Sequence, residues 1–150
     1  GERTPHNLDQ PAGGFFGLSR NDGPLEMARA VMEGVAYSLA DCAAALTAAG
    51  ARVEKLTAVG GGARSGFWLQ TLADVLERPL ALNPNAEHAA ALGGARLAMA
   101  AARGHSVIDV VAAAPTPGDL ETIQPRPETF TAYRTAVQRY RDLFNALKEV

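Results

Sequence analysis

Apolar residues recur in alternating steps of three and four along two long stretches of this chain. The first stretch spans residues 24–49, and the second runs from about residue 128 to residue 148. This spacing places the apolar side chains on one side of an α-helix, so both stretches are predicted to be helices that pack against a core. The two stripes consist of Leu25, Ala28, Met32, Val35, Leu39, Cys42, Leu46 and Ala49, and of Phe130, Tyr133, Val137, Tyr140, Phe144 and Leu147.

Shorter patterns fill the region between these two helices. They are two β-compatible apolar runs at residues 56–59 and 80–82, helical patterns at residues 65–78, 87–103 and 106–113, and an extended piece at residues 122–125. Short apolar runs followed by helices are typical of interior strands in a mostly parallel sheet. The chain is therefore predicted to have an α/β fold in which long helices pack short, mostly parallel strands.

Two stretches depart from these regular patterns. Residues 1–23 are rich in Pro, Asn and Gly and are expected to form loops, apart from the apolar patch Phe15–Leu18, which suits an edge strand or a plug on the core. Gly93–Gly94 interrupts the helical pattern of residues 87–103, at a cost of about 1 kcal/mol per glycine relative to alanine. Close approach of another backbone, from the turn at residues 60–62 or from a neighbouring helix, is expected to explain these glycines.

Composition and charge agree with one soluble globular domain. The chain has 150 residues, of which 47% are hydrophobic and 20% are charged. This length and this hydrophobic fraction are sufficient to form a core. A net charge of −2, without a clustered Lys/Arg stripe, argues against a nucleic-acid partner. No apolar run reaches membrane-spanning length, no signal-peptide pattern is visible, and the single Cys42 fits a reducing compartment. These features predict a cytoplasmic protein without a membrane partner.

The candidate site is the turn between the first predicted strand and the helix that follows it. Gly60, Gly61 and Gly62 follow the strand directly, and Ser65 stands where the helical pattern begins. Residues without a Cβ let a ligand approach the backbone closely, and a helix that begins at a Ser N-cap directs free N–H groups toward anions. The pattern favours a nucleotide-facing corner of an α/β sheet, and a tight turn that binds nothing is the alternative.

Other catalytic and phosphate-binding motifs are missing from the sequence. It contains no Gly-x-x-x-x-Gly-Lys-Ser/Thr loop, no Gly-x-Ser-x-Gly elbow and no Cys/His metal spacing. Gly60-x-Gly62-x-x-Ser65 resembles a dinucleotide fingerprint, but that motif needs an acidic residue about 20 positions further on. Here the second strand ends at Leu82 and no carboxylate precedes Glu87, so a dinucleotide-binding oxidoreductase is a minor alternative. Glu87 is expected to interact with the start of its own helix.

The glycine turn and its surroundings resemble the adenosine motif of the FGGY carbohydrate kinases. The residues that carry this resemblance are Gly60, Gly61, Gly62, Ala63, Arg64 and Ser65, followed by Trp68, Gln70, Leu72, Ala73 and Asp74. Three further segments extend it, namely Gly1–Asn7 with Phe15–Leu18, Ala28–Tyr37 and Ala91–Ala98. Within the family these segments are most similar to xylulokinases. The resemblance covers most of residues 1–104, whereas residues 105–150 agree only in length and in the helical ending.

The resemblance implies that residues 1–150 form the C-terminal part of an actin-like, ribonuclease H-like ATPase domain. The upstream hairpins and a whole N-terminal domain would then lie outside this chain, which also begins at Gly1 without a methionine. The family transfers the γ-phosphoryl group of Mg-ATP to a sugar hydroxyl, and a xylulokinase converts D-xylulose to xylulose 5-phosphate. Carried over by motif, the residues that would bind ATP are Gly60, Gly61, Gly62, Ala63 and Ser65.

The same resemblance places the remaining chemistry upstream of this chain. No catalytic residue and no ligand for Mg²⁺ is assigned here, Asp74 is interpreted as a structural helix residue, and Gly93 is expected to let its helix lie close to the nucleotide pocket. The implied partners are ATP or ADP and a sugar bound mainly by the upstream part, with homodimerisation left open. A kinase for another pentose, hexose or polyol is one alternative, and a non-catalytic actin-like nucleotide-binding module is the other. The chain alone is expected to be inactive and to self-associate.

Overall fold

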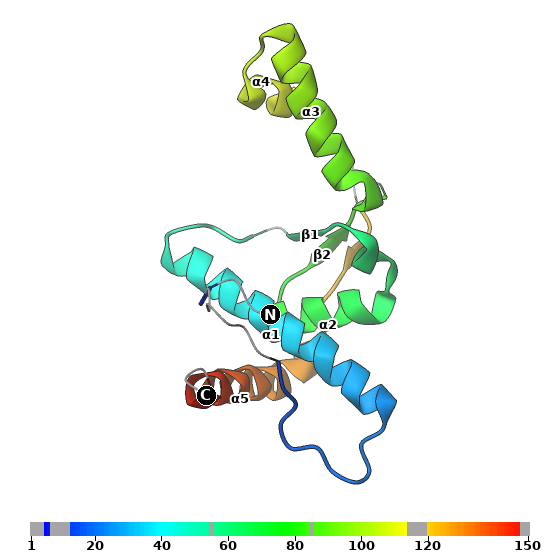
Figure 1. The fold of residues 1–150 in the computed structure, drawn as a ribbon, viewed down its shortest axis with the longest axis vertical. Coiled ribbons are helices and arrows are strands. Elements are labelled where there is room, and N and C mark those ends of the chain that lie inside the picture. Colours follow the sequence, from blue (N-terminus) through cyan, green and yellow to red (C-terminus); the bar gives the residue numbers. More distant parts are fainter. Residues whose placement is uncertain (1–4, 7–12, 55, 85, 114–119, 148–150) are drawn as a thin grey trace.

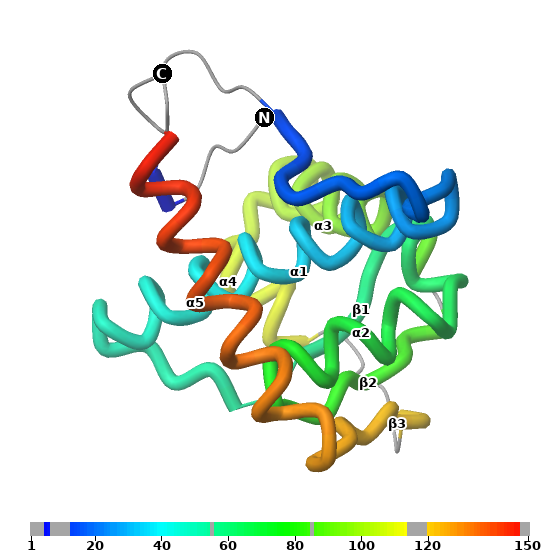
Figure 2. Tube along the Cα trace, turned by 90° about the horizontal axis from the view of Figure 1, so that it is seen from below, coloured from blue at the N-terminus to red at the C-terminus, as the bar shows by residue number. Residues whose placement is uncertain are grey.

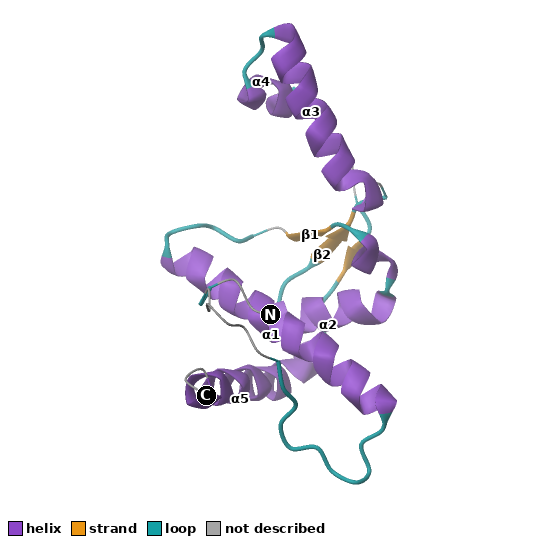
Figure 3. Ribbon diagram, viewed as in Figure 1, coloured by secondary structure: helices purple, strands orange, loops and turns teal. Residues whose placement is uncertain are grey.

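The computed structural model describes residues 5–6, 13–54, 56–84, 86–113 and 120–147. Within these ranges the chain is predominantly helical, with a small sheet at its centre (Figures 1 and 3). The elements are α1 (Pro24–Ala48), β1 (Leu56–Ala58), α2 (Gly66–Leu76), β2 (Leu80–Leu82), α3 (Ala89–Arg103), α4 (Val107–Ala112), β3 (Thr122–Ile123) and α5 (Phe130–Leu147), with single 3₁₀ turns η1 (Gly61–Arg64), η2 (Ala86–His88) and η3 (Pro127–Thr129). The predicted α/β class is confirmed.

The sheet has the strand order β1-β2-β3 and is mixed. Strands β1 and β2 are parallel, with Leu56 opposite Leu80, and α2 provides the crossover that parallel neighbours require. Strand β3 pairs antiparallel with β2, placing Ile123 opposite Leu80. The predicted extended piece at residues 122–125 therefore contributes an antiparallel edge to an otherwise parallel pair.

The core lies where α1, α2, α5 and one face of the sheet meet. Helix α2 supplies most of it because this helix is apolar around much of its circumference. Helix α5 packs against both α1 and α2 on the side away from the sheet (Figures 1 and 2). The buried members of this cluster are Ala36, Leu69, Leu72, Ala73, Val75, Leu80 and Val137.

The side of helix α1 that faces the core is not the side that carries the predicted apolar stripe. Val35 and Leu39 of that stripe are exposed, whereas Ala36 and Asp41 are buried. The buried side is the one with small residues, which lets α1 approach α2 closely. Periodicity failed here because α1 carries apolar residues on two sides, and spacing alone does not say which side meets the core. The predicted α5 stripe is in better agreement, since Val137 is buried and Tyr133 packs on the core.

Helices α3 and α4 form an arm that projects from the sheet, away from α1, α2 and α5 (Figure 1). The two helices pack on each other, and Ala100 and Val110 are buried. Helix α3 runs without a break through Gly93 and Gly94, and a Cβ built on either glycine meets no described atom within 4 Å. The expected close approach of another described backbone at these glycines is therefore wrong, whereas the closeness of Gly93 to the nucleotide pocket stays a prediction.

The N-terminal patch Phe15–Leu18 forms neither a strand nor a plug. Phe15 and Phe16 are 47% and 64% exposed, and the Arg139 guanidinium lies 5.7 Å from the centre of the Phe16 ring. The loop predictions for residues 1–4 and 7–12 lie outside the described residues. None of the described helices combines the length and the apolar character that crossing a membrane requires.

Candidate functional site

The glycine turn lies at the carboxyl end of β1, beside the turn that follows β2. Because β1 and β2 are parallel, their carboxyl ends lie at the same end of the sheet, and α/β folds bind ligands at this end. The two turns are joined through the backbone, since Gly60 N–H donates to the Ala86 carbonyl at 2.8 Å. The structure therefore brings the predicted site to the expected edge of the sheet.

The three glycines of this turn meet three different requirements. Gly60 has φ 84° and ψ −179°, a backbone conformation that is essentially restricted to glycine. Gly61 is exposed, and a Cβ built on it meets no described atom within 4 Å. A Cβ on Gly62 would lie 3.2 Å from Nε1 of Trp68, so this part of the turn rests on the indole ring. Gly61 thus presents backbone to open space, while its neighbours fix the shape of the turn.

Ser65 ends the turn and begins α2, as the sequence predicts. Its Oγ accepts a hydrogen bond from the Trp68 backbone N–H at 3.3 Å, which makes it the N-cap. The remaining free N–H groups of the first helical turn give this end of α2 partial positive character. Ala63 and Ser65 are both half-buried, whereas Gly61 and Gly62 are exposed. The five residues carried over from the resemblance therefore lie together in the turn that leads into α2.

Arg64, inside the same turn, forms a bidentate ion pair that sequence reasoning missed. Its Nε donates to Oε1 of Glu87 at 2.5 Å, and its Nη2 donates to Oε2 of the same carboxylate. The hydrogen bonds from Arg64 hold the pKa of Glu87 below its usual value. Glu87 was expected to interact with its own helix, yet it spans the gap to the neighbouring turn. The available signal was a base and an acid placed after two successive parallel strands.

Asp74, further along the same motif, is fully buried and binds to the protein's own donors. Its carboxylate accepts from Gln70 Nε2 at 2.9 Å, from the Arg126 backbone N–H at 2.8 Å and from Arg126 Nη2 at 2.6 Å. Burial by itself would raise the pKa of Asp74, but the hydrogen bonds from Arg126 and Gln70 lower it below the usual value. This arrangement ties the segment after β3 to α2 and agrees with a structural role for Asp74.

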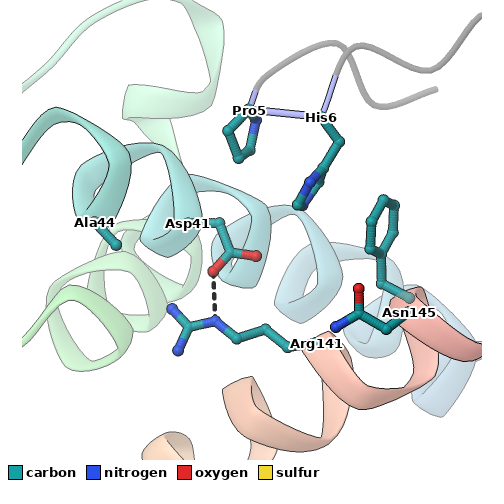
Figure 4. Close-up of a pocket in the computed structure, with 7 residues that line it drawn as sticks. Pro5, His6, Asp41, Ala44, Arg141 and Asn145 are labelled. Atoms are coloured by element: carbon teal, nitrogen blue, oxygen red, sulfur yellow. Dashed lines mark hydrogen bonds and ion pairs between the residues drawn. The ribbon is translucent and has the colours of Figure 1, made fainter. Parts of the chain in front are cut away.

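A hollow of about 290 Å³ lies away from this turn, between Pro5–His6, α1 and α5 (Figure 4). Its nearly buried carboxylate, on Asp41, accepts a hydrogen bond from Arg141 Nε at 2.6 Å. The His6 ring stacks on Phe144, with ring centroids 4.0 Å apart. Because the carboxylate is matched by Arg141 and the rings cover each other, we interpret the hollow as a seam between packed elements. It does not compete with the glycine turn as a nucleotide site.

The chain matches the C-terminal domain of the FGGY family of carbohydrate kinases over residues 1–102. The chain belongs to this family. FGGY kinases have an actin-like ATPase fold, and the small sheet with its covering helices is part of that fold. The glycine turn lies inside the matched range, whereas β3 and α5 follow it.

Individual FGGY kinases are similar to almost the whole chain. Xylulose kinase of Escherichia coli (strain K12) is 40% identical over 148 residues, which are 98% of this chain and 30% of that protein. Gluconokinase of Bacillus licheniformis is 34% identical over 150 residues, covering 99% of this chain and 28% of that protein. The crystal structure of a xyloylose kinase from Brucella ovis has a TM-score of 0.80 at 40% identity, covering 98% of this chain and 30% of that one.

These relatives are much longer than the chain described here, which spans about 30% of their length. Their similarity extends beyond residue 102 and therefore includes β3 and α5. The tail, which resembled the family only in length and helical ending, is thus part of the shared architecture. This agrees with the contacts of Asp74, which join the FGGY motif directly to Arg126.

Proposed function

We propose that this chain supplies the adenosine-binding side of the active-site cleft in an ATP-dependent sugar kinase. The observation that carries the proposal is the glycine turn, which presents open backbone and a capped helix start at the carboxyl edge of two parallel strands. Glycine backbone lets a nucleotide approach closely, and a helix start favours its negative phosphates. Membership of a carbohydrate-kinase family supports ATP as the nucleotide.

The residues proposed to bind ATP act through shape and through their backbones. Gly60 sets the direction of the turn, Gly61 and Gly62 present the exposed surface to the adenosine, and Ala63 and Ser65 form the floor. The open space at Gly61 fits a ligand group that packs directly on the backbone. Any side chain at this position would occupy that space.

The proposed reaction moves the γ-phosphoryl group of ATP to a sugar hydroxyl. The bond between the γ-phosphorus and the β–γ bridging oxygen breaks, a bond to the sugar oxygen forms, and the hydroxyl proton passes to a base. Mg²⁺ would arrive with the phosphates of ATP and neutralise their charge. Among the described residues no group of three or more His, Cys, Asp or Glu side chains could hold a metal ion. The resemblance to the family, and no finding of absence, is the reason why the proposal assigns the base, the metal contacts and the sugar contacts to other parts of the protein.

The proposed substrate is D-xylulose, phosphorylated to xylulose 5-phosphate. Support comes from relatives that are named xylulose kinase and that cover nearly all of this chain. The similarity to a gluconokinase favours one alternative, a kinase for another sugar or polyol, because the adenosine side of the cleft does not touch the sugar. We also propose that the chain is the C-terminal part of a longer kinase. This kinase is proposed to be cytoplasmic and to form a homodimer.

A coupled assay of ADP formation on the full-length protein tests this function. We expect turnover that requires both ATP and D-xylulose, with one phosphate added at the 5-hydroxyl by mass spectrometry and ³¹P NMR. A higher kcat/KM for gluconate or another polyol would replace the substrate and retain the kinase. Binding of ATP without turnover on any sugar would favour a non-catalytic module, and preferential binding of NAD would revive the dinucleotide alternative. Residues 1–150 alone are expected to show no turnover.

A further inference from the structure

We propose that the Arg64–Glu87 ion pair is a latch that positions the glycine turn for nucleotide binding. The inference rests on the proposed function of this turn and adds to it two positioning residues outside the five proposed to contact ATP. Arg64 belongs to the turn itself, and Glu87 belongs to η2 after the neighbouring strand. The pair therefore joins the two loops at the carboxyl edge of the sheet.

The described contacts hold the glycine turn at three points. The Gly60 N–H donates a hydrogen bond to the Ala86 carbonyl, the Trp68 indole lies against Gly62, and Arg64 forms an ion pair with Glu87. The first and third contacts reach the same short segment, η2, from either end of the turn. Between them a Cβ built on Gly61 meets no described atom within 4 Å, so the ion pair adds a second connection from the turn to η2 beside the Gly60–Ala86 hydrogen bond.

The geometry of the pair suits positioning better than stabilisation. A guanidinium and a carboxylate that meet through two parallel hydrogen bonds have a fixed relative orientation. The side chains are 71% and 41% exposed, and ion pairs this exposed contribute little to folding. Holding a loop in its binding conformation, however, lowers the ordering cost that a ligand must otherwise meet. The expected effect is therefore on nucleotide affinity, with little effect on folding.

The charge of Glu87 gives the latch a second consequence. The Glu87 carboxylate is ionised at neutral pH with or without Arg64, because the ordinary pKa of glutamate is about 4.3. It lies at the carboxyl ends of β1 and β2, where a polyanionic nucleotide would bind. While paired it is neutralised, but removal of Arg64 leaves an uncompensated negative charge. Loss of Arg64 should thus weaken binding more than loss of both partners together. This asymmetry reports the charge of Glu87, and recovery of affinity when the two charges are exchanged reports the positioning by the pair.

The chain contains a matched control in the Arg134–Glu77 pair. Arg134 Nε and Nη2 both donate to Glu77 at 2.5 Å, so the contact is bidentate like that of Arg64. The side chains of this second pair are 68% and 26% exposed, so Arg134 matches Arg64 in exposure while Glu77 is more buried than Glu87. It joins the end of α2 to α5 and touches neither turn. A general effect of losing an Arg–Glu pair would appear equally at both places.

The test is isothermal titration calorimetry with MgADP on the full-length protein and its variants. Arg64→Met is expected to weaken MgADP binding roughly fivefold, the upper range for one exposed ion pair. Arg64→Met combined with Glu87→Met should recover part of the loss, and the exchange Arg64→Glu with Glu87→Arg should recover more. Arg134→Met should stay within about twofold of the wild type, the limit set for an indirect effect. Thermal unfolding of each variant should show that all are folded and that Arg64→Met and Arg134→Met shift the unfolding temperature by similar amounts.

Two results would overturn the latch, and they are distinguishable from failure of the proposed function. Unchanged affinity in Arg64→Met, with normal binding by the wild type, overturns the latch alone. Equal losses in Arg64→Met and Arg134→Met also overturn it, because the effect would then be general. Absence of any MgADP binding by the folded wild-type protein overturns the proposed function and the latch with it.

Discussion

Gly60 and Gly61 are adjacent and chemically identical, yet the structure assigns them different tasks. Gly60 adopts a backbone conformation that other residues avoid, at a cost of about 1–3 kcal/mol. Gly61 has an ordinary backbone and open space where its Cβ would be. The backbone conformation therefore accounts for the first glycine, whereas only the proposed nucleotide would account for the second.

Alanine at each of these glycines should separate the two tasks. Gly60→Ala is expected to lower the free energy of unfolding by about 1–3 kcal/mol, measured by urea denaturation, because the turn is strained. Gly61→Ala should leave the unfolding midpoint unchanged and weaken MgADP binding, since its methyl group would meet the ligand. A stability loss at Gly61 equal to that at Gly60 would contradict this assignment.

At this scale the sequence predicted the strand–turn–helix corner that holds the candidate site, but not the contacts within it. Three glycines before a Ser N-cap indicated a strand–turn–helix corner, and the structure has that corner. Motif spacing alone did not give the partner of Arg64, because Glu87 is 23 residues away and reaches the turn only through the pairing of β1 with β2. Long-range pairs of this kind depend on strand register, which motif spacing does not contain.

Among the elements, β3 and α5 are held to α2 by the buried carboxylate of Asp74. Arg126, which follows β3, meets it with both a backbone N–H and its guanidinium. The contact explains why a tail with little sequence signal is nevertheless part of the fold. It also gives the stability of the domain a defined pH dependence.

Asp74 should stabilise the native state above about pH 4 and lose this contribution in acid. Its folded-state pKa is lower than its unfolded value near 3.9, so protons bind preferentially to the unfolded chain as the pH falls. Urea unfolding of the wild type between pH 7 and pH 3 should show this loss, and Asp74→Asn should show less of it. At pH 7 the Asn variant should be about 1.5–3 kcal/mol less stable, the range for hydrogen bonds to a charged group, because Asp74 is buried but the Arg126 side chain is half exposed.

Asp142 provides the control for this substitution. It accepts a hydrogen bond from Gln138 at 2.9 Å, in the same four-residue spacing that joins Gln70 to Asp74. Asp142 is exposed, so Asp142→Asn should leave stability at pH 7 within about 0.5 kcal/mol of the wild type. Equal losses in the free energy of unfolding for the two substitutions would show that the burial of Asp74 does not increase its contribution to stability.

The helices themselves were largely predictable from periodicity, but the side each one buries was not. Long helices at residues 24–48 and 130–147 match the predicted stretches because apolar spacing and the Pro24 start are local signals. The core-facing side of α1 differs because Ala36 packs more closely than Val35 or Leu39 could. Choosing between two apolar sides requires the position of α2, which only the folded chain supplies.

Across the whole molecule, several apolar surfaces remain open. The outward side of α1 exposes Val35, Leu39 and Leu46, and the arm exposes Leu97 and Ile108. Strand β1 is an edge of the described sheet, so its outer backbone groups are available for pairing. Patches of this kind and open strand edges are surfaces that other polypeptide normally covers.

Residues 1–150 produced alone are therefore expected to self-associate. Size-exclusion chromatography with light scattering at increasing concentration should show a mass that rises above 15.7 kDa. Val35→Glu combined with Leu39→Glu should reduce this association without unfolding the chain, because both side chains are exposed. A constant monomer mass over the full concentration range would contradict the expectation.

The placement of α5 also has a consequence for the order in which the chain can fold during synthesis. Its contacts with α1 join residues 100 positions apart, from Arg141 to Asp41 and from Tyr133 to Glu33. At about 5–20 residues per second, a ribosome needs roughly 5–20 s to add that length of chain. The face of α1 and α2 that α5 covers therefore stays exposed until α5 has been translated. Completion of this core cannot precede the synthesis of α5.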